Sequence, residues 1–526
     1  MMLRRTVTKL ALSAPLLAAT GRGALAQDAS TISGGFDVGP GGMPGNFNPM
    51  TATAGFTWLS LYLEPLVIYD AKLEAVVGAL ASTYQVSPDQ TAYTFRLADA
   101  RWHDGQAFTS ADVRFTIELA KNAASGSNFA ARLAAITAVE TPDAHTAVLK
   151  LSAPNAALLD TLTKVMMLPA HALSAIPTAD LPRHAWWSTT PIGTGPFKFN
   201  RYVNGQYVAL VANPDYRGGK PKVDRVVNRY FENTAGAVAA LRSGEIQFSY
   251  VESDDVATFQ NNPAFRIIEG NSYVVNYLGF NQEVPVWKDV RVRRAVMHAI
   301  DRAAIIKSLY GGAALPADCG YVSPALVPPG IDAYAHDPAR AKALLAEAGW
   351  AQINGSKPIT LLTYYNTPLA ANVMAAIQAM LAEVGINVVP RIVDVPTYNS
   401  IVYAATPDWN SFAMVYAGLQ NGPDPSIINI GLNEKQLPPA GANIMRVRMP
   451  KLTAAFDAAL GETDGSKRAQ RYQDVCRVMN ADLPWGTLWV TSRYGVASTR
   501  LKDFTWIPAP AGGPYEAHPE RWALAR

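Results

Sequence analysis

The sequence contains only two cysteines, Cys319 and Cys476, in 526 residues. So few cysteines exclude a small scaffold held together by a disulfide framework. Whether the two form one disulfide or remain separate buried thiols stays open, because the sequence does not supply the required geometry. Charged residues are also sparse, at 17% against 49% hydrophobic residues, which excludes a disordered chain. A chain of this length and composition is expected to fold as several structural units.

The chain has no large excess of either charge. Its 45 lysines and arginines stand against 42 acidic residues. Four of the basic residues lie in the first 26 positions, which hold no acid, so the rest of the chain has 41 basic and 42 acidic residues. This balance argues against a nucleic acid or an anionic membrane as the main partner.

No hydrophobic run is long enough to span a bilayer, which takes about 20 residues. The apolar run at residues 10–19 is about half that length and follows the arginine pair Arg4-Arg5. Ala24-Leu25-Ala26 then forms a small-residue cleavage site. We therefore predict a signal peptide at residues 1–26, using the twin-arginine route with the Sec route as the alternative. Cleavage near Ala26 would release a periplasmic protein.

Common catalytic and metal-binding patterns are missing. None of the seven histidines has the spacing of a zinc-binding helix, and no Gly-x-Ser-x-Gly elbow, Walker loop or dinucleotide glycine motif is present. Residues 193–196 resemble a phosphate loop only superficially, because Pro196 has no N–H group to donate. We predict no catalytic residue, metal site or cofactor. Acidic pairs that are remote in the chain still permit a secreted hydrolase of a peptide or glycan, which is the alternative class.

Two segments have the pattern of a helix followed by a buried strand. Residues 235–242 are helix-like and residues 246–251 are strand-like, and residues 373–383 and 386–393 repeat this order. A glycine separates helix from strand in both cases, as is typical of an α/β layer. Because the two units lie well over a hundred residues apart, we predict two separate α/β lobes.

The segment at about residues 70–190 has a different pattern. Thr91 to Leu97 and Thr146 to Leu151 alternate between apolar and polar residues, and Asp104-Gly105 is a turn signal. This segment is predicted to form a mixed, mostly antiparallel subdomain.

The motifs, taken in order from about Phe47 to about Trp489, resemble those of one protein family. This is solute-binding family 5 of the ABC importers, which includes the oligopeptide- and dipeptide-binding proteins. The motifs that carry the resemblance are Asn46-Phe47-Asn48-Pro49, Leu63-Glu64-Pro65-Leu66-Val67, His103-Asp104-Gly105, Thr109-Ser110-Ala111-Asp112-Val113, Gly193-Thr194-Gly195-Pro196-Phe197, Asn213-Pro214-Asp215-Tyr216, Asp289-Val290-Arg291-Val292-Arg293-Arg294-Ala295 and Asp337-Pro338.

The resemblance implies an α/β fold: a two-lobed periplasmic binding protein of type II, cluster C, with an extra mixed α+β subdomain in lobe one. The implied boundaries are residues 27–280 for lobe one, including the subdomain at about 70–190, residues 281–490 for lobe two, and residues 491–526 for a return to lobe one. The chain would cross between lobes near Gly279-Phe280-Asn281 and near Val490-Thr491. Two crossings make a hinge with few moving dihedral angles.

The resemblance also implies a transport role and no enzymatic activity. The protein would capture a small solute, most simply a peptide, between its lobes and deliver it to a membrane permease with its ATPase. Closure on the ligand would give the permease a surface it can distinguish. The expected state is a monomer without a nucleic-acid partner. A receptor that presents the same ligand to a membrane sensor is a further alternative.

One stretch departs from the family's peptide binders, which often carry Gly-Trp-x-x-Asp before an Asp-Pro. In those proteins the first Asp pairs with the peptide ammonium, since an unpaired buried charge is costly. Here residues 417–425 place Leu419 where Trp is common, and Asn421 or Gly422 at the ammonium-binding position. Gln420 and Asn421 suit a neutral polar ligand, so an oligosaccharide or an opine-like compound remains open beside a peptide.

Ligand-binding residues are predicted on several loops of both lobes. Asp424 is expected to cap a helix or fix a turn, with binding of the ligand's amine as the alternative. Residues 364–367 follow a strand, at the edge where α/β proteins bind ligands. Each aromatic residue has core packing as its alternative. The candidates are Thr53, Phe56, Thr57, Trp58, Tyr364, Asn366, Tyr398, Tyr416, Gln420, Asn421 and Asp424.

Overall fold

The structure is a computed structural model of the chain. It describes residues 30–35, 47–52, 56–231, 234–321, 323–406, 408, 411–420, 422–438, 441–508 and 514–525. The predicted signal peptide at residues 1–26 lies outside these ranges. Within them, no helix combines the length and the apolar character that crossing a membrane requires.

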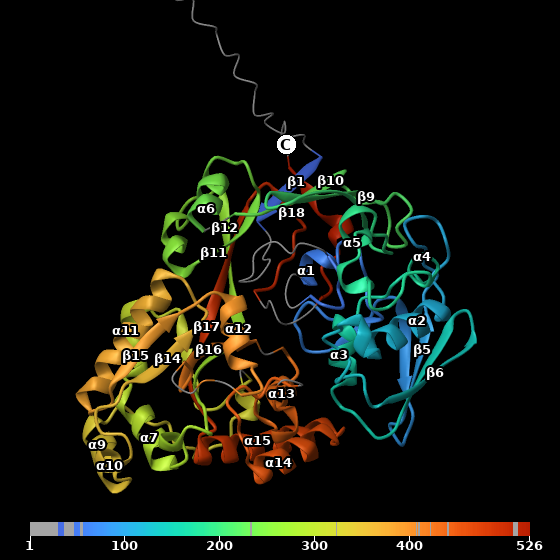
Figure 1. Cartoon of the computed structure of the whole chain (residues 1–526). Helices are drawn as coiled ribbons and strands as arrows, with labels where there is room; N and C mark the ends of the chain where they lie inside the picture. The colour runs from blue at the N-terminus through green and yellow to red at the C-terminus, as the bar shows by residue number, and fades with distance from the viewer. Residues whose placement is uncertain are drawn as a thin grey trace, which may run out of the picture.

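One mixed sheet runs through the molecule and joins its two lobes (Figure 1). The central strands β12 (Phe265–Phe280) and β17 (Trp485–Ser498) are long, antiparallel to each other and shared by both lobes. The strand order is β15 (Val388–Ile392), β14 (Ile359–Thr363), β16 (Met414–Gln420), β12, β17, β11 (Phe248–Val251), β1 (Thr31–Gly35), β10 (Arg225–Arg229), β9 (Tyr207–Ala212) and β8 (Phe197–Val203), with β13 (Ala314–Pro316) pairing to β17.

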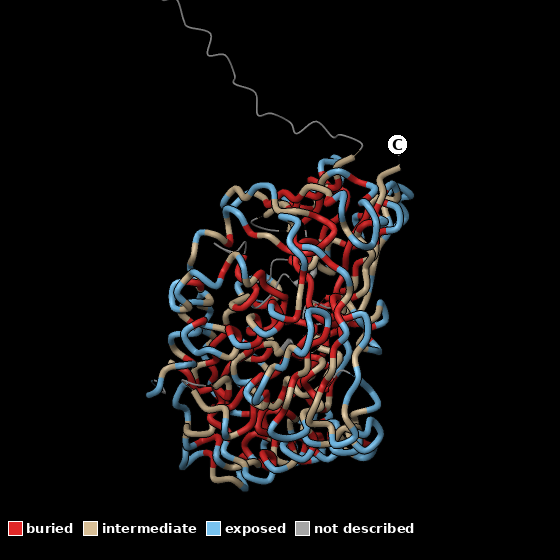
Figure 2. Tube along the Cα trace, turned by 90° about the vertical axis from the view of Figure 1, so that its right-hand side faces the viewer, coloured by how far each residue is buried: buried red, intermediate tan, exposed pale blue. Residues whose placement is uncertain are grey.

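Each lobe has its own hydrophobic core. The core of lobe one extends from Ile32 to Trp522 in the sequence, whereas the cores of lobe two draw on residues between Tyr277 and Trp489. Figure 2 shows the buried stretches in the interior of the molecule and the exposed ones around its periphery. Separate cores are what two lobes that move relative to each other require.

Both predicted helix–glycine–strand units are present. In lobe two, α11 (Pro368–Glu383) connects the parallel strands β14 and β15 and buries Val373, Ile377 and Leu381. In lobe one, α6 (Thr234–Arg242) leads into β11. Gly244 and Gly385 both adopt positive φ angles, which allow the sharp exit from each helix.

The helix predicted from Asp337-Pro338 is confirmed as α9 (Pro338–Glu347). The side chain of Asp337 accepts a hydrogen bond from the backbone N–H of Arg340 at 2.8 Å, and the proline occupies the first turn, where no N–H partner is needed. The remaining helices are α1 (Phe56–Leu59), α2 (Ser110–Lys121), α3 (Leu158–Lys164), α4 (Ala170–Leu173), α5 (Trp186–Thr189), α7 (Val290–Ala299), α8 (Arg302–Leu309), α10 (Trp350–Ile353), α12 (Val395–Val402), α13 (Ile427–Leu432), α14 (Pro450–Leu460) and α15 (Gly465–Asp482).

The predicted antiparallel subdomain is also present. Its sheet has the order β4 (Ala81–Val86), β5 (Ala92–Leu97), β7 (Thr146–Leu151) and β6 (Ile136–Asp143), and all neighbours are antiparallel. Helix α2 packs on it after a capping box formed by Thr109 and Asp112. Two small two-stranded sheets, β2 (Val67–Tyr69) with β3 (Val76–Gly78) and β18 (Leu501–Lys502) with β19 (Ala523–Leu524), complete lobe one.

The pairing of β12 with β17 has a break where the sheet passes between the lobes. Ser272, Tyr273 and Val274 stand opposite the single residue Thr491, and Tyr273 has a φ angle of 61° below zero-crossing only in sign from the ordinary region, at 55°. From Val274 onward β12 also pairs with β16 of lobe two. The change in pairing therefore comes before the crossing predicted at residues 279–281, where β12 continues unbroken, and the predicted lobe boundaries stay predictions.

The glycine turn at residues 193–196 packs against the lobe-one core. A Cβ atom on Gly193 would lie 1.7 Å from the carbonyl oxygen of Tyr62, so a side chain cannot be accommodated. The same turn holds the ring of His103: the N–H of Gly193 donates to Nδ1 at 3.0 Å, and Nε2 lies 3.0 Å from the carbonyl oxygen of Gly195. These partners require the neutral tautomer with its proton on Nε2.

We predict that His103 makes the protein sensitive to acid. Burial lowers the pKa of His103 to about 4, because a charged ring is poorly solvated there. The unfolded chain takes up this proton near pH 6.5 and the folded chain does not, so the contribution of His103 is complete above pH 6.5 and declines as the pH falls toward 4. The loss over this window is about 2 to 3 kcal/mol.

Urea unfolding of the wild type and His103→Gln at a series of pH values measures this effect. The variant should be less stable near pH 8 but should show a smaller decline between pH 6.5 and 4. Parallel stability curves for the two proteins would show that His103 is not responsible.

The two cysteines form a disulfide, which answers the question that the sequence left open. Cys319 and Cys476 have Cα atoms 5.6 Å apart. Cys476 lies on α15, and Cys319 lies in a segment that follows this helix, residues 318–332, which we call the strap. Asn480, one turn beyond Cys476, donates to the carbonyl oxygens of Asp318 and Asp332 at 3.1 and 2.8 Å.

Candidate functional site

The predicted lobe-one loop contributes mainly to the core where it can be followed. Trp58 is buried, and its ring lies 5.0 Å from that of Phe47 in an edge-to-face arrangement. Phe56 and Thr57 belong to α1, but their side chains are not described, and Thr53 lies outside the described residues. Of these four candidates, Trp58 therefore follows its core-packing alternative.

A cluster of tyrosines stands at the carboxyl ends of the lobe-two strands. Tyr364 follows β14, and its ring lies 4.6 Å from that of Tyr365 and 4.9 Å from that of Tyr398. The ring of Tyr365 lies 5.5 Å from that of Tyr416 on β16. The structure thus brings together three predicted residues, Tyr364, Tyr398 and Tyr416, around Tyr365, which the sequence analysis had placed in this loop without selecting it.

Members of the tyrosine cluster differ in what they can offer a ligand. Tyr398 and Tyr416 are buried, and Tyr416 Oη lies 3.2 Å from Tyr310 Oη. Tyr364 is half-buried, and Asn366 beside it is exposed. Tyr364 and Asn366 are therefore the candidates that can reach a ligand directly, while the deeper rings support them.

Two bonds to the central strands position the upper tyrosines. Tyr364 Oη donates to the carbonyl oxygen of Gly418 at 3.4 Å, and Tyr365 Oη donates to Asn276 Oδ1 at 3.4 Å. A Cβ atom on Gly418 would lie 2.2 Å from Tyr365 Oη, so the absence of a side chain there leaves room for that ring.

The buried tyrosines remain protonated and neutral. Burial raises the pKa values of Tyr365, Tyr398 and Tyr416 well above their ordinary value. The cluster can therefore provide aromatic contacts and hydroxyl donors, and it does not provide a general base near neutral pH.

Asp424 is engaged by another residue of lobe two. Arg468 on α15 donates to both carboxylate oxygens, at 2.7 and 3.0 Å, and the N–H of Ser426 donates at 2.9 Å. Burial raises the pKa of Asp424, but the Arg468 guanidinium and the bond from Ser426 outweigh it and hold the pKa below the usual value. This geometry matches the turn-fixing role and leaves neither oxygen without a partner for a ligand amine.

The two neighbouring candidates cannot be placed to the same degree. Gln420 is the last residue of β16, where it pairs with Val274, but its side chain is not described. Asn421 lies outside the described residues. Within the ranges that the structure covers, no group of three or more histidine, cysteine or acidic side chains is arranged to hold a metal ion.

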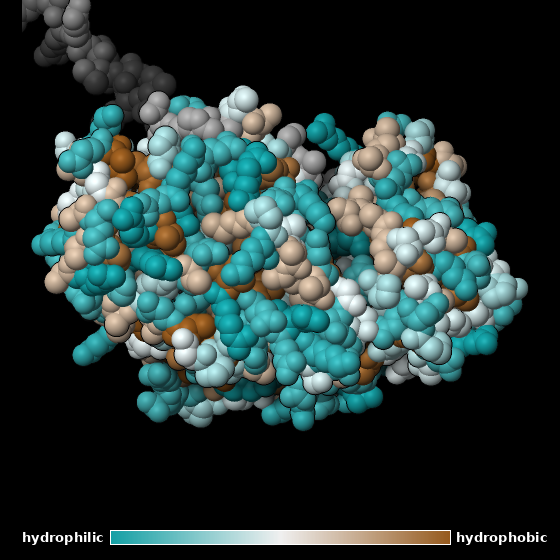
Figure 3. Space-filling model, turned by 90° about the horizontal axis from the view of Figure 1, so that it is seen from below, coloured by the Kyte–Doolittle hydropathy of each residue, from teal (hydrophilic) through white to brown (hydrophobic). Residues whose placement is uncertain are grey.

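Hollow surfaces occur at more than one place. Seen from below, the molecular surface is hollowed between its two unequal parts (Figure 3). A separate groove of about 640 Å³ lies in lobe one and is lined in part by Arg266, Lys502, Phe504, His518 and Arg521. This groove is formed by the C-terminal segment, and it contains none of the predicted ligand-binding residues.

The chain matches the family model described as bacterial extracellular solute-binding proteins, family 5 Middle, over residues 75–433. It is 66% identical over 529 residues to a protein of Brucella ovis whose name places it among ABC transporter peptide-binding proteins, and the alignment covers 100% of both chains.

Solved structures share the fold. The oligopeptide-binding protein AppA of Bacillus subtilis, in complex with a nonapeptide, has a TM-score of 0.82 at 24% identity, covering 94% of this chain and 99% of AppA. The binding protein AgaA of A. tumefaciens R10, in complex with agropinic acid, has a TM-score of 0.76 at 25% identity, covering 94% of this chain and 99% of AgaA.

Proposed function

The chain belongs to the bacterial extracellular solute-binding proteins of family 5, and on this basis we propose that it binds a peptide between its lobes for an ABC importer. The family and the two-lobed type II fold that the motifs predicted are both confirmed. The peptide, the permease with its ATPase and the periplasmic location are the proposed parts.

The observation that carries the peptide proposal is the Brucella relative, whose similarity extends over the whole chain. The tyrosine cluster at the ends of β14 and β16 is consistent with this proposal. Aromatic rings with fixed hydroxyl donors can contact side chains of varied shape and can bond to a peptide backbone. In this proposal the ligand leaves chemically unchanged.

Isothermal calorimetry with the mature protein tests the proposed ligand. Di- to nonapeptides, a set of oligosaccharides and a set of opines would be titrated separately, after unfolding and refolding the protein to remove any ligand carried through purification. Heat from peptides alone supports the proposal. Heat only from sugars or from opines overturns the peptide choice while leaving the solute-binding role intact.

An opine-like ligand is the second candidate, and two observations favour it. Both oxygens of Asp424 are engaged by Arg468, so this carboxylate does not offer a peptide ammonium a partner. AgaA, which has the same fold, is solved with agropinic acid. Mass spectrometry of the ligand released from protein purified out of its native host would distinguish the two classes directly.

We predict that Asn366→Ala weakens ligand binding without changing stability. Asn366 is exposed at the carboxyl end of β14, where loss of one amide bond to a ligand costs about 1 kcal/mol, or about a fivefold increase in Kd. Asn372→Ala is the matched control, because Asn372 is an exposed asparagine within α11. Equal Kd values for Asn366→Ala and Asn372→Ala would remove Asn366 from the proposed site.

A further inference from the structure

Charged side chains gather where the lobe-one subdomain meets lobe two. The N–H of Ala156 donates to the carbonyl oxygen of Leu460 at 3.1 Å, which joins the lobes directly. Ala156 precedes α3, and Leu460 ends α14 shortly before α15 begins. The residues of this region that we call the interlobe charge cluster are Arg132, Asp160, Lys164, Asp424 and Arg468.

The lobe-one part contains a closed ion pair. Lys164 donates to both carboxylate oxygens of Asp160, at 3.0 and 2.9 Å, and Tyr69 Oη donates to Asp160 at 2.8 Å. The side chains of Lys164 and Asp160 are only 10% and 11% exposed. Asp160 is therefore fully engaged within its own lobe, as Asp424 is in lobe two.

Arg468 has one donor that its ion pair does not use. Its two terminal nitrogens contact Asp424, and the side chain is 16% exposed. Its Nε atom is buried and has no hydrogen-bond partner among the described residues. A buried guanidinium N–H without an acceptor is costly, which indicates that an acceptor belongs there.

Arg132 is the cation of the cluster that has no carboxylate of its own. It is half-buried, and within the described part of the chain it makes no hydrogen bond or ion pair. Nearby, Asn128 Nδ2 donates to the carbonyl oxygens of Thr51 and Ala52, at 3.0 and 3.4 Å, which places this segment beside the loop predicted to face the ligand. Burial lowers the pKa of Arg132, and the charge of Asp160 acts against this.

The charges from the two lobes act on common groups. Burial raises the pKa of Tyr69 far above its ordinary value, and the charges of Asp160 and Asp424 raise it further while Arg468 lowers it. Tyr69 therefore feels charges from both lobes. The cluster has three cations and two anions, so it carries one positive charge more than its carboxylates balance. A desolvated cation without a counter-ion is unfavourable.

We propose that a carboxylate of the ligand binds in the interlobe charge cluster, accepting hydrogen bonds from Arg132 of lobe one and from Nε of Arg468 of lobe two. This inference rests on the proposed solute-binding function and adds the chemical group that is recognised. Guanidinium groups bind carboxylates through planar, charge-assisted hydrogen bonds. A carboxylate held by both lobes stabilises the closed arrangement only while the ligand is present.

The first test needs no knowledge of the natural ligand. In the ligand-free protein, Arg132→Gln removes an unpaired cation and should raise the melting temperature by about 2 to 4 °C. Sodium acetate, compared with sodium chloride at the same ionic strength, should raise the melting temperature of the wild type and not that of Arg132→Gln. Arg201→Gln is the matched control, because Arg201 is an exposed arginine on β8 of the same lobe. An equal response to acetate in all three proteins would overturn the proposal.

The second test compares the same peptide with a free and an amidated C-terminus by calorimetry. Amidation should weaken binding to the wild type about tenfold and should have little effect on Arg132→Gln, since the charge-assisted bond is already lost. Equal weakening by amidation in both proteins would contradict the inference while the peptide-binding function stood. If no peptide binds, the proposed function fails, and the acetate experiment still decides for or against the carboxylate site.

Discussion

Removing the Cys319–Cys476 disulfide is expected to lower the free energy of unfolding by about 5 kcal/mol. The bond joins residues separated by 157 positions, so it closes a long loop in the unfolded chain and restricts that state strongly. In the folded protein the same bond fixes the strap on α15, beside the bonds of Asn480 to Asp318 and Asp332. The expected loss is large because both effects act in the same direction.

Calorimetric melting of the wild type, with and without a reductant, and of the double variant Cys319→Ser/Cys476→Ser measures this loss. The reductant should lower the melting temperature of the wild type and leave the variant unchanged, since the chain contains no other cysteine. A variant that melts within a degree or two of the oxidised wild type would contradict the expected stabilisation.

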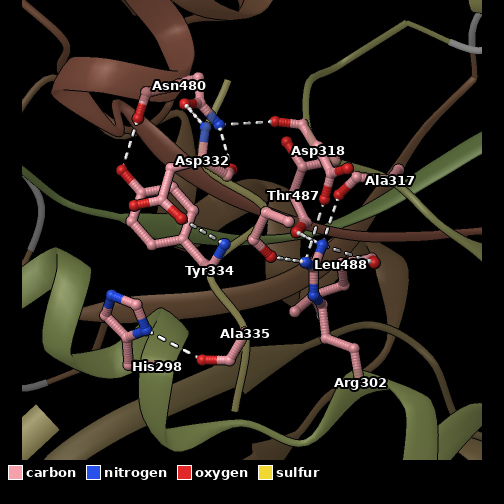
Figure 4. A network of polar contacts seen from close by, with 11 residues as sticks. His298, Arg302, Ala317, Asp318, Asp332, Tyr334, Ala335, Asn480, Thr487 and Leu488 are labelled. Carbon is pink, nitrogen blue, oxygen red and sulfur yellow. Dashed lines mark hydrogen bonds and ion pairs between the residues drawn. The ribbon is translucent and has the colours of Figure 1, made fainter. Parts of the chain in front are cut away.

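Substitution of Arg302 by methionine is expected to destabilise lobe two by about 3 to 4 kcal/mol. This buried arginine on α8 donates to the carbonyl oxygens of Ala317 and Thr487, at 2.6 and 3.3 Å, and to Asp318 at 3.0 Å (Figure 4). It also donates to the carbonyl oxygen of Ala333. Methionine keeps much of the volume but leaves these acceptors without their donor.

Arg340→Met is the control for this substitution. Arg340 lies on α9 and forms an exposed ion pair with Glu347 at 3.5 Å, so its loss should change stability by less than about 0.5 kcal/mol. Urea unfolding of both variants gives the comparison. Similar midpoints for Arg302→Met and Arg340→Met would show that the buried network contributes little.

The parts of the fold that the sequence predicted correctly depend on short-range signals. The Asp337 cap and Pro338 fix the start of α9 within a few residues, and Gly385 ends the unit that connects α11 to β15. The alternation of β5 and β7 likewise reports a local property, the two faces of a strand. Such signals need no knowledge of the remaining chain.

The parts that the sequence did not predict depend on contacts between distant residues. No local pattern indicates that β12 breaks its pairing at Tyr273 or that Arg468 binds Asp424. The candidate site shows the same limit. Trp58 and Tyr364 are both aromatic residues in predicted loops, yet one is buried in a core and the other is half-buried beside exposed Asn366. The surroundings that separate them come from other segments of the chain.

The unequal strand lengths at the break between β12 and β17 bear on the way in which the lobes swing. β12 has three residues, Ser272 to Val274, where β17 has only Thr491, so one side of the joint has slack and the other has none. Rotation can fold or straighten the longer side, whereas the shorter side can only twist. The axis of the swing is thus expected to lie near Thr491, so that lobe two turns about β17 as a door turns on the edge that carries its hinges.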